Sequence, residues 1–335
     1  MKKQIITLIS LCLLFSLPLV TSVYGAGAQP NLKLVHIDRL DSGLTYGTYT
    51  VENLRGFNNV GAPCALYSNQ DMRAIYCMLG RALILLCDGH GPYGGVVADK
   101  VTSLLPLEVF KTKDAAVGFQ NGFQKLQQMF EKAAYAQQSG TTCVGVQIHG
   151  NKLMIANAGD SRLVVIRPNG KTASVVFSTI DHKPSNQQEL SRIKAAKGVT
   201  NGGYIINKNG NGLAVTRTLG DVEFHQDDLV IAAPELFEFT LQDGDSVFLA
   251  SDGYWDVFSN SETALNASLQ LKETAAHCGS KQLQAMGIDL NNHDEVQQAW
   301  NGHFCSHFAE FSAKAARSKG SYDDITVTVV RYSEL

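Results

Sequence analysis

Seven short segments rich in Val, Ile, Leu and Thr recur along the 335-residue chain, and they constrain its fold more than any other feature. They cover residues 82–87, 142–149, 153–156, 163–167, 173–177, 246–250 and 325–331. Their length and β-branched content predict strands. Asn151-Lys152 and Pro168-Asn169-Gly170 provide turns between neighbouring segments, so several of these strands should pair as antiparallel hairpins.

Segments with apolar residues three and four positions apart lie between and after these strands, and they predict helices. They cover residues 94–105, 119–138, 187–196, 262–272 and 294–317. Hairpins with separate helical blocks predict an α+β fold with mainly antiparallel sheets. The 44% of hydrophobic residues is enough for a well-buried core. Because no middle segment resembles a linker and no repeat is found, we expect one domain over residues 40–332.

The N-terminus has the pattern of a secretory signal peptide. Lys2 and Lys3 precede an apolar run over residues 5–20, and small residues follow at 25–28. The run is shorter than the roughly 20 residues of a membrane span, although an uncleaved anchor is the alternative. We therefore expect residues 1–28 to be removed. The mature chain should be exported, either periplasmic or secreted, with no stable membrane span.

Charge and cysteine content narrow the partners and the cross-links. The net charge is −3 and no run of Lys or Arg appears, so a nucleic-acid partner is not expected. We expect a monomer. Six cysteines remain after the signal peptide, which permits disulfides in an exported chain, and Cys64 with Cys77 and Cys278 with Cys305 are the local pairs to test. The other two lie in predicted strands, where buried free thiols are more common.

Four aspartate-bearing motifs stand at the ends of predicted strands or in the turns beyond them. They are residues 87–91 (CDGHG), 158–162 (AGDSR), 251–256 (SDGYWD) and 320–324 (GSYDD). Carboxylates that face one another at a sheet rim repel unless a cation lies between them, and Mg²⁺ prefers such oxygen ligands. Gly89 has no side chain, so its carbonyl can also approach a metal closely. The motifs together predict a metal centre that activates water to hydrolyse a phosphate ester.

The set and order of these motifs resemble the protein phosphatase 2C family of metal-dependent Ser/Thr phosphatases. The similarity covers roughly residues 40–332. It is densest over residues 180–186 (IDHKPSN), 191–193 (SRI), 213–221 (LAVTRTLGD), 232–235 (AAPE) and 251–257. The resemblance implies a four-layer α–β–β–α sandwich of two mainly antiparallel sheets, with metals held between the ends of the sheets. It also implies a phosphoserine- or phosphothreonine-containing protein as the substrate.

The resemblance assigns roles to individual residues. The metal ligands that it implies are Asp88, Gly89, Asp160, Asp252 and Asp323. Asp88 would bridge two Mg²⁺ or Mn²⁺ ions, and Asp160 together with Asp252 would hold a possible third. His90 would be the general acid that protonates the leaving oxygen, a role that suits an imidazole near neutral pH.

In the protein phosphatase 2C family, the first motif usually consists of an Arg, then any four residues, then Glu-Asp. This chain departs from that pattern. Here Asp71 keeps its place as the residue that orders metal-held water, Gln70 replaces Glu, and Leu66 stands where Arg binds the substrate phosphate. Arg73 or Arg55 could supply the missing contact. Alternatively, the domain could be a pseudophosphatase that serves as a binding or regulatory domain.

Other polar positions have less specific interpretations. Residues 201–211 are rich in Asn and Gly and predict a flap over the site. Asp181 and Asp221 are expected to anchor loops through backbone N–H groups rather than to act in catalysis. The segment 275–307 carries His277, His293, His303 and His307, for which a zinc site is conceivable. Their irregular spacing favours a solvated helical face instead.

Overall fold

Two antiparallel sheets form the centre of the molecule in a computed structural model, which describes residues 44–51 and 69–334. The first sheet contains, in spatial order, β1 (Leu44–Val51), β15 (Ile325–Tyr332), β14 (Ser246–Ala250), β7 (Arg162–Asn169) and β8 (Thr172–Ser178). The second contains β12 (Leu219–Gly220), β4 (Gly140–Thr141), β3 (Arg81–His90), β5 (Cys143–His149), β6 (Lys152–Ala158) and β13 (Glu235–Thr240), with β2 (Asp71–Met78) beside β3. Both predicted sheets are thus present.

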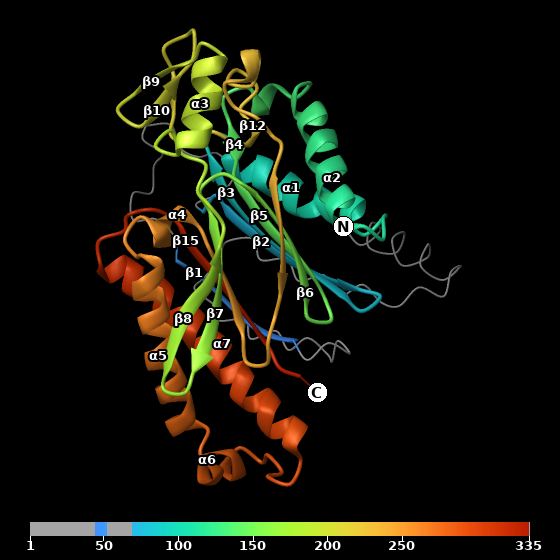
Figure 1. The fold of residues 1–335 in the computed structure, drawn as a ribbon, viewed down its shortest axis with the longest axis vertical. Coiled ribbons are helices and arrows are strands. Elements are labelled where there is room, and N and C mark those ends of the chain that lie inside the picture. Colours follow the sequence, from blue (N-terminus) through green and yellow to red (C-terminus); the bar gives the residue numbers. More distant parts are fainter. Residues whose placement is uncertain (1–43, 52–68, 335) are drawn as a thin grey trace, which may run out of the picture.

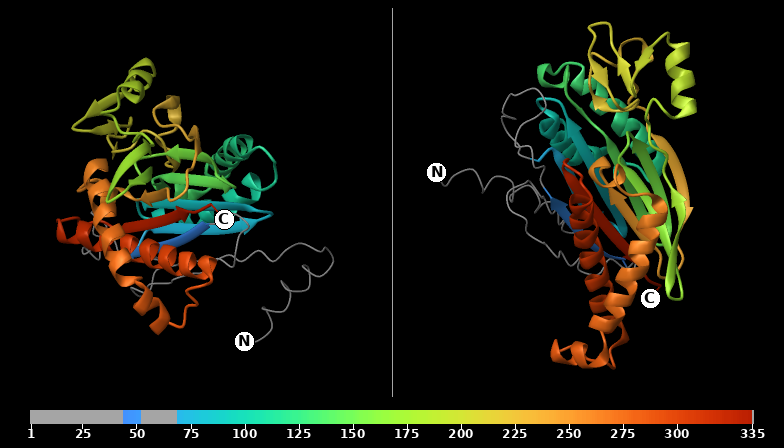
Figure 2. Two further views of the ribbon diagram at one scale, coloured as in Figure 1. Left: turned by 60° about the horizontal axis from the view of Figure 1, so that its bottom comes forward. Right: turned by 90° about the vertical axis from the view of Figure 1, so that its left-hand side faces the viewer.

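Helices cover the outer face of each sheet (Figures 1 and 2). α1 (Gly94–Val109) and α2 (Ala115–Phe130) pack on the second sheet, and α5 (Asn260–His277) and α7 (His293–Ser318) pack on the first. In β3, Leu83 and Leu85 face the helices while Ile84 and Leu86 face the other sheet. This burial of both faces explains why residues 82–87 of the strand are all apolar. The predicted α–β–β–α sandwich is confirmed.

The helices differ from their predicted bounds, as α2 and α1 illustrate. α2 begins at Ala115 rather than at residue 119, since the Asp114 carboxylate accepts hydrogen bonds from the N–H groups of Ala116 and Val117. α1 continues past residue 105 although Pro106 lies inside it. Proline lacks an N–H group, but the helix still extends to Val109, which is fully buried.

One predicted disulfide is wrong. Cys278 and Cys305 are both free thiols, because Cys305 faces the sheet with its Sγ 3.5 Å from the carbonyl oxygen of Thr45, whereas Cys278 is the C-cap residue that follows α5. Cys77 is also a free thiol, and its predicted partner Cys64 lies outside the described residues.

The predicted signal peptide, residues 1–28, also lies outside the described residues. Among the helices that are described, none combines the length and the apolar character that a membrane crossing requires.

A small subdomain stands above the rim where the two sheets meet (Figure 1). It contains α3 (Gln187–Ala195) and a three-stranded sheet of β9 (Val199–Asn201), β10 (Tyr204–Ile206) and β11 (Gly212–Leu213). Ile193, Ile205, Phe224 and Val230 form its own apolar cluster. The segment predicted as a flap therefore belongs to a folded unit with a small core.

Glu189 of α3 ties this subdomain to the segment that leads back to the sheet. One carboxylate oxygen accepts hydrogen bonds from Nε and Nη2 of Arg217, at 3.0 and 2.6 Å. The other accepts from Thr216 Oγ1 at 2.7 Å and from Arg192 Nη2 at 2.9 Å. Burial raises the pKa of Glu189, but these donors outweigh it and lower the pKa to about 2.

We expect Glu189→Gln to reduce the free energy of unfolding at pH 7 by about 3 kcal/mol, because it removes a buried carboxylate that two partly buried arginines share. A carboxyl whose pKa is depressed in the folded state contributes stability above its ordinary pKa of 4.5 and loses it as the pH falls toward about 2. The difference from wild type should therefore shrink between pH 4.5 and 2. Urea unfolding at several pH values measures this, with the exposed Glu238→Gln as the control. Equal curves for both variants would contradict the assignment.

Candidate metal centre

Asp88 lies near the end of β3, directly opposite Asp71 of β2 in the strand register. Its backbone N–H donates to Thr142 Oγ1 at 3.2 Å, and its carbonyl accepts from the Thr142 N–H at 2.9 Å. The next residue must be Gly89, because a Cβ there would stand 2.5 Å from the backbone of Gly94. The first turn of α1 thus packs tightly against the end of β3 and fixes its position.

Asp252 begins the short helix α4 (Asp252–Trp255), which follows β14. A Cβ on Gly253 would lie 2.0 Å from the carbonyl oxygen of Asp324, so only glycine lets α4 approach the 323–324 turn this closely. The buried Trp255 donates its indole N–H to the carbonyl oxygen of Ala250 at 3.0 Å and anchors the helix.

The carboxyl groups of Asp88 and Asp252 meet at the rim of the two sheets. They are close enough to share a hydrogen bond, and burial raises both pKa values well above their ordinary range. The negative charges of Asp71 and Asp323 raise the pKa of Asp88 further, and those of Asp160 and Asp323 raise that of Asp252. Without a cation, the cluster therefore favours protonation of at least one carboxyl group.

Asp71 belongs to the same cluster. Its Oδ2 accepts a hydrogen bond from Ser251 Oγ at 2.8 Å, whereas its Oδ1 is buried and has no hydrogen-bond partner. Burial and the charge of Asp324 raise the pKa of Asp71 to about 8. A buried oxygen without a donor is costly, and it is the kind of atom that a cation or its water satisfies.

The Asp323-Asp324 turn differs from the prediction in detail. The exposed Asp323 accepts the Asp324 N–H at 2.8 Å with Oδ1, while the carboxyl of Asp324 is buried and accepts the Gln70 N–H at 2.9 Å. As the described side chains stand, no three from His, Cys, Asp and Glu are arranged to hold an ion. Coordination by Asp323 requires its carboxyl to turn inward. Asp324, which sequence reasoning missed, joins the cluster instead.

Gln70 has a contact that a glutamate could not make. Its side-chain amide donates to the carbonyl oxygen of Gly91 at 2.9 Å, next to His90. A carboxylate in this position would face that oxygen without a proton to share. Arg73, a predicted substitute for the missing phosphate ligand, donates to Thr50 Oγ1 inside the sandwich. Leu66 and Arg55 lie outside the described residues.

His90 stands at the end of β3 with its side chain 30% exposed and its Nε2 2.6 Å from Oδ2 of the buried Asp221. Burial lowers the pKa of His90, but the charge and hydrogen bond of Asp221, with the charge of Asp160, outweigh it and raise the pKa. Gly140 leaves room for this pair, because a Cβ there would lie 2.0 Å from Asp221 Oδ2. We predicted Asp221 as a loop anchor, but its carboxylate instead contacts His90 and favours the charged form of the imidazole.

We expect Asp221→Asn to lower the pKa of His90, because it removes the negative charge in contact with the ring. Titration of the imidazole resonances by NMR measures this directly. Asp181→Asn is the matched control, since Asp181 pairs with Arg162 at 2.8 and 2.7 Å and not with a histidine. An unchanged His90 titration in Asp221→Asn would contradict the role of the pair.

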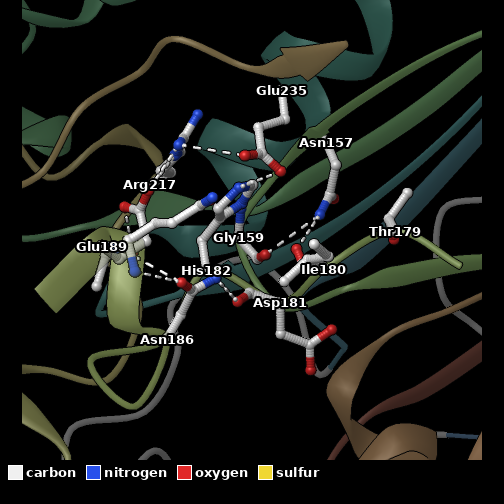
Figure 3. Close-up of polar contacts among 12 residues, drawn as sticks. Asn157, Gly159, Thr179, Ile180, Asp181, His182, Asn186, Glu189, Arg217 and Glu235 are labelled. Atoms are coloured by element: carbon white, nitrogen blue, oxygen red, sulfur yellow. Dashed lines mark hydrogen bonds and ion pairs between the residues drawn. The ribbon is translucent and has the colours of Figure 1, made fainter. Parts of the chain in front are cut away.

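Asp160 follows β6 and is held in place by its neighbour Gly159, whose contact with His182 Figure 3 shows. The Gly159 N–H donates to Nδ1 of the fully buried His182 at 3.1 Å. This contact assigns the remaining ring proton to Nε2, which lies 3.3 Å from Glu235. Asp160 itself faces Lys183, whose Nζ is 3.1 Å from Asp160 Oδ2 and 3.1 Å from Asp256 Oδ1. The ammonium group thus bridges the two carboxylates.

Three arginines of the neighbouring motifs form ion pairs with carboxylates. Arg162 makes a double hydrogen bond to Asp181, and Arg192 and Arg217 both bind Glu189. The structure therefore uses them to hold loops and the subdomain together, as Figure 3 shows for Arg217.

The amino-acid sequence is similar to those of known protein phosphatases. A sequence model of the family described as Protein phosphatase 2C matches residues 81–295, which is more than half of the chain. Protein phosphatase 1B from Homo sapiens is 38% identical over 178 residues, covering 49% of this chain and 35% of its own length. Protein phosphatase 2C 77 from Arabidopsis thaliana is 33% identical over 219 residues, covering 63% of this chain and 47% of its own. The chain thus aligns with less than half the length of either relative.

Solved structures show the same fold at low sequence identity. A serine-threonine phosphatase 2C from Toxoplasma gondii has a TM-score of 0.62 at 15% identity, with 94% of this chain and 100% of that chain covered. A sex determining protein of C. elegans has a TM-score of 0.59 at 21% identity, with 87% and 65% covered.

Proposed function

Because the chain belongs to the protein phosphatase 2C family, we propose that it hydrolyses phosphoserine and phosphothreonine on proteins with the help of Mg²⁺ or Mn²⁺. The contact between the carboxyl groups of Asp88 and Asp252 carries this proposal. Two buried carboxyl groups in contact are unfavourable in a purely structural role, so their position at the rim of the sandwich favours a cation site.

The donor set fits two hard divalent cations, with a possible third. Asp88, the carbonyl of Gly89, Asp252 and Asp323 would hold the two ions, and the buried Oδ1 of Asp71 would accept a hydrogen bond from their water. Such ions, when bound, supply an activated water and positive charge that offsets the charge of the phosphate. The protein contributes a rigid frame, since the close packing of Gly89 and Gly253 fixes two of the ligand-bearing segments.

His90 is the residue that can give a proton to the leaving oxygen. Its contact with Asp221 raises its pKa, and its side chain remains partly exposed at the rim. It can therefore keep a proton to higher pH than an ordinary imidazole and still meet a substrate. No observation favours the pseudophosphatase alternative. Within the described residues, the replacement of Glu by Gln70 fits the structure, because the Gln70 amide donates a hydrogen bond to the carbonyl oxygen of Gly91.

The test is hydrolysis of an aryl phosphate and of phosphopeptides by the chain beginning at residue 29. We expect turnover with Mn²⁺ or Mg²⁺ that EDTA abolishes and that Asp252→Ala lacks. Preference for phosphopeptides supports a protein substrate, whereas equal rates on small esters would point to a broader phosphatase. Activity no greater than that of Asp252→Ala would refute the enzymatic function.

We also propose that residues 1–28 direct export to the periplasm or the medium and are then removed, and that the mature chain acts as a monomer. The order of basic, apolar and small residues at the N-terminus supports the first statement. The mass of the exported chain tests whether residues 1–28 are removed. Its size in solution tests whether it is a monomer.

We expect Lys183→Met to tighten binding of a third cation by at least about tenfold, because the Lys183 ammonium already bridges Asp160 and Asp256. Burial lowers the pKa of Lys183, but these two carboxylates outweigh it and raise the pKa, so the ammonium is charged at pH 7. Titration of Mn²⁺ followed by EPR measures the number and affinity of the ions. Lys171→Met, in the exposed β7–β8 turn, is the control. Equal ion binding in both variants would show that Lys183 does not compete with the ion.

A further inference from the structure

Three histidines that are far apart in sequence meet on the outer helical layer. His277 ends α5, and His303 and His307 lie on α7. The ring centroids of His277 and His303 are 4.0 Å apart, those of His303 and His307 are 3.9 Å apart, and those of His277 and His307 are 6.2 Å apart. His303 and His307 are four residues apart and so share one face of the helix.

These three histidines resemble a set of metal ligands more than a group of surface salt bridges. Within residues 44–51 and 69–334, none of the three rings has a hydrogen bond or a carboxylate partner, and their aromatic contacts are with one another. Burial, followed by the charges of His307 and His277, lowers the pKa of His303 to about 4. The His303 imidazole is therefore neutral at pH 7 and has a free lone pair.

We propose that His277, His303 and His307 form a surface site for a borderline transition-metal cation such as Zn²⁺, Ni²⁺ or Cu²⁺. Imidazole nitrogens suit these ions, whereas the carboxylates at the rim suit Mg²⁺ and Mn²⁺. Three protein ligands leave a coordination position for water or an anion. The site thus differs from the rim in both its donor atoms and the ions it selects.

Side-chain rotation completes the site. As they stand, the rings are stacked, and no three described side chains converge on an ion. His277 and His307 are exposed, so their rings can rotate without disturbing the core, while His303 is partly buried and fixed between them. Rotation of the two outer rings about the fixed one brings nitrogens toward a common point.

The site lies at the opposite end of α5 from the carboxylates. Asn260, the first residue of α5, accepts a hydrogen bond from Arg162 at the rim, at 2.9 Å. His277 is the last residue, which places it about 25 Å along the helix axis from that contact. Figure 1 shows α5 and α7 running side by side away from the rim. A bound ion would therefore join the far end of α5 to the middle of α7.

The test uses the Asp252→Ala chain so that the rim contributes little to binding and no phosphatase assay is needed. We expect one saturable site for Zn²⁺ or Ni²⁺ by calorimetry and a higher melting temperature with the ion. His303→Gln and the exposed His307→Gln should each weaken binding at least tenfold. His293→Gln, on the same helix about 15 Å away, should leave it unchanged.

Two outcomes would overturn the site. One is the absence of saturable Zn²⁺ or Ni²⁺ binding to the Asp252→Ala chain. The other is binding that persists in both His303→Gln and His307→Gln, since the exposed His307 can be replaced without loss of the fold. Neither outcome bears on hydrolysis at the rim, because the readouts are ion binding and melting temperature alone.

Discussion

Asp88→Asn is expected to lower the turnover of phosphopeptides by at least about a thousandfold and, at the same time, to stabilise the metal-free protein. The first effect follows because Asp88 is the carboxylate proposed to bridge both ions. The second follows because Asp88 is in contact with Asp252 and is repelled by Asp71 and Asp323. An amide of the same shape removes one charge from this cluster. A residue retained for packing alone would not combine these opposite effects.

The pH dependence of the second effect has a definite sign. The pKa of Asp88 is raised in the folded state, so the protein keeps its full stability below the ordinary value of 3.8 and loses stability as the pH rises above it. The advantage of Asp88→Asn should therefore be present at pH 7 and absent below about pH 3.8. Melting curves in EDTA measure it, with Asp289→Asn in the exposed loop before α7 as the control. A lower melting temperature for Asp88→Asn at pH 7 would contradict the argument.

The sequence predicted the sandwich well because its signals are local. Both faces of β3 are buried, so residues 82–87 are all apolar: Leu83 and Leu85 pack under the helices while Ile84 and Leu86 pack between the sheets. The same strand carries Asp88 to the rim, so the predicted cluster with Asp252 follows once the two sheets pack together. The similarity to the protein phosphatase 2C family, inferred from motif order, is confirmed by the match over residues 81–295.

Contacts between distant residues could not be predicted in this way. Asp221 is 131 residues from His90, and its motif alone indicates only a turn. Lys183 lies in a loop motif with no sign that its ammonium would reach both Asp160 and Asp256. These contacts depend on side-chain direction and on how the small subdomain docks, neither of which has a periodic pattern in sequence. The same is true of the three stacked histidines, whose irregular spacing favoured a solvated face.

His90→Gln is expected to slow hydrolysis of phosphoserine peptides by about 10²- to 10⁴-fold while leaving ion binding unchanged. A serine alkoxide is a poor leaving group and needs a proton as it departs, whereas an aryl oxide needs little. The variant should therefore lose much less activity on an aryl phosphate. Since the His90 imidazole pairs with Asp221, which is not among the proposed metal ligands, and the substitution leaves the Gly89 carbonyl in place, Mn²⁺ affinity should match wild type.

The pH profile separates a proton donor from a residue that only shapes the site. Asp221 raises the pKa of His90, so the wild-type rate should fall only above the ordinary imidazole value of 6.5, as the ring loses its proton. That descending limb should shift to lower pH in Asp221→Asn and be absent in His90→Gln. Measuring kcat/KM as a function of pH for phosphoserine peptides and for an aryl phosphate tests this in all three proteins. Only a residue that protonates the leaving oxygen makes the loss of activity depend on the leaving group. If His90→Gln lost equal activity on alkyl and aryl esters and kept the descending limb of the pH profile, the proton donor would be another residue.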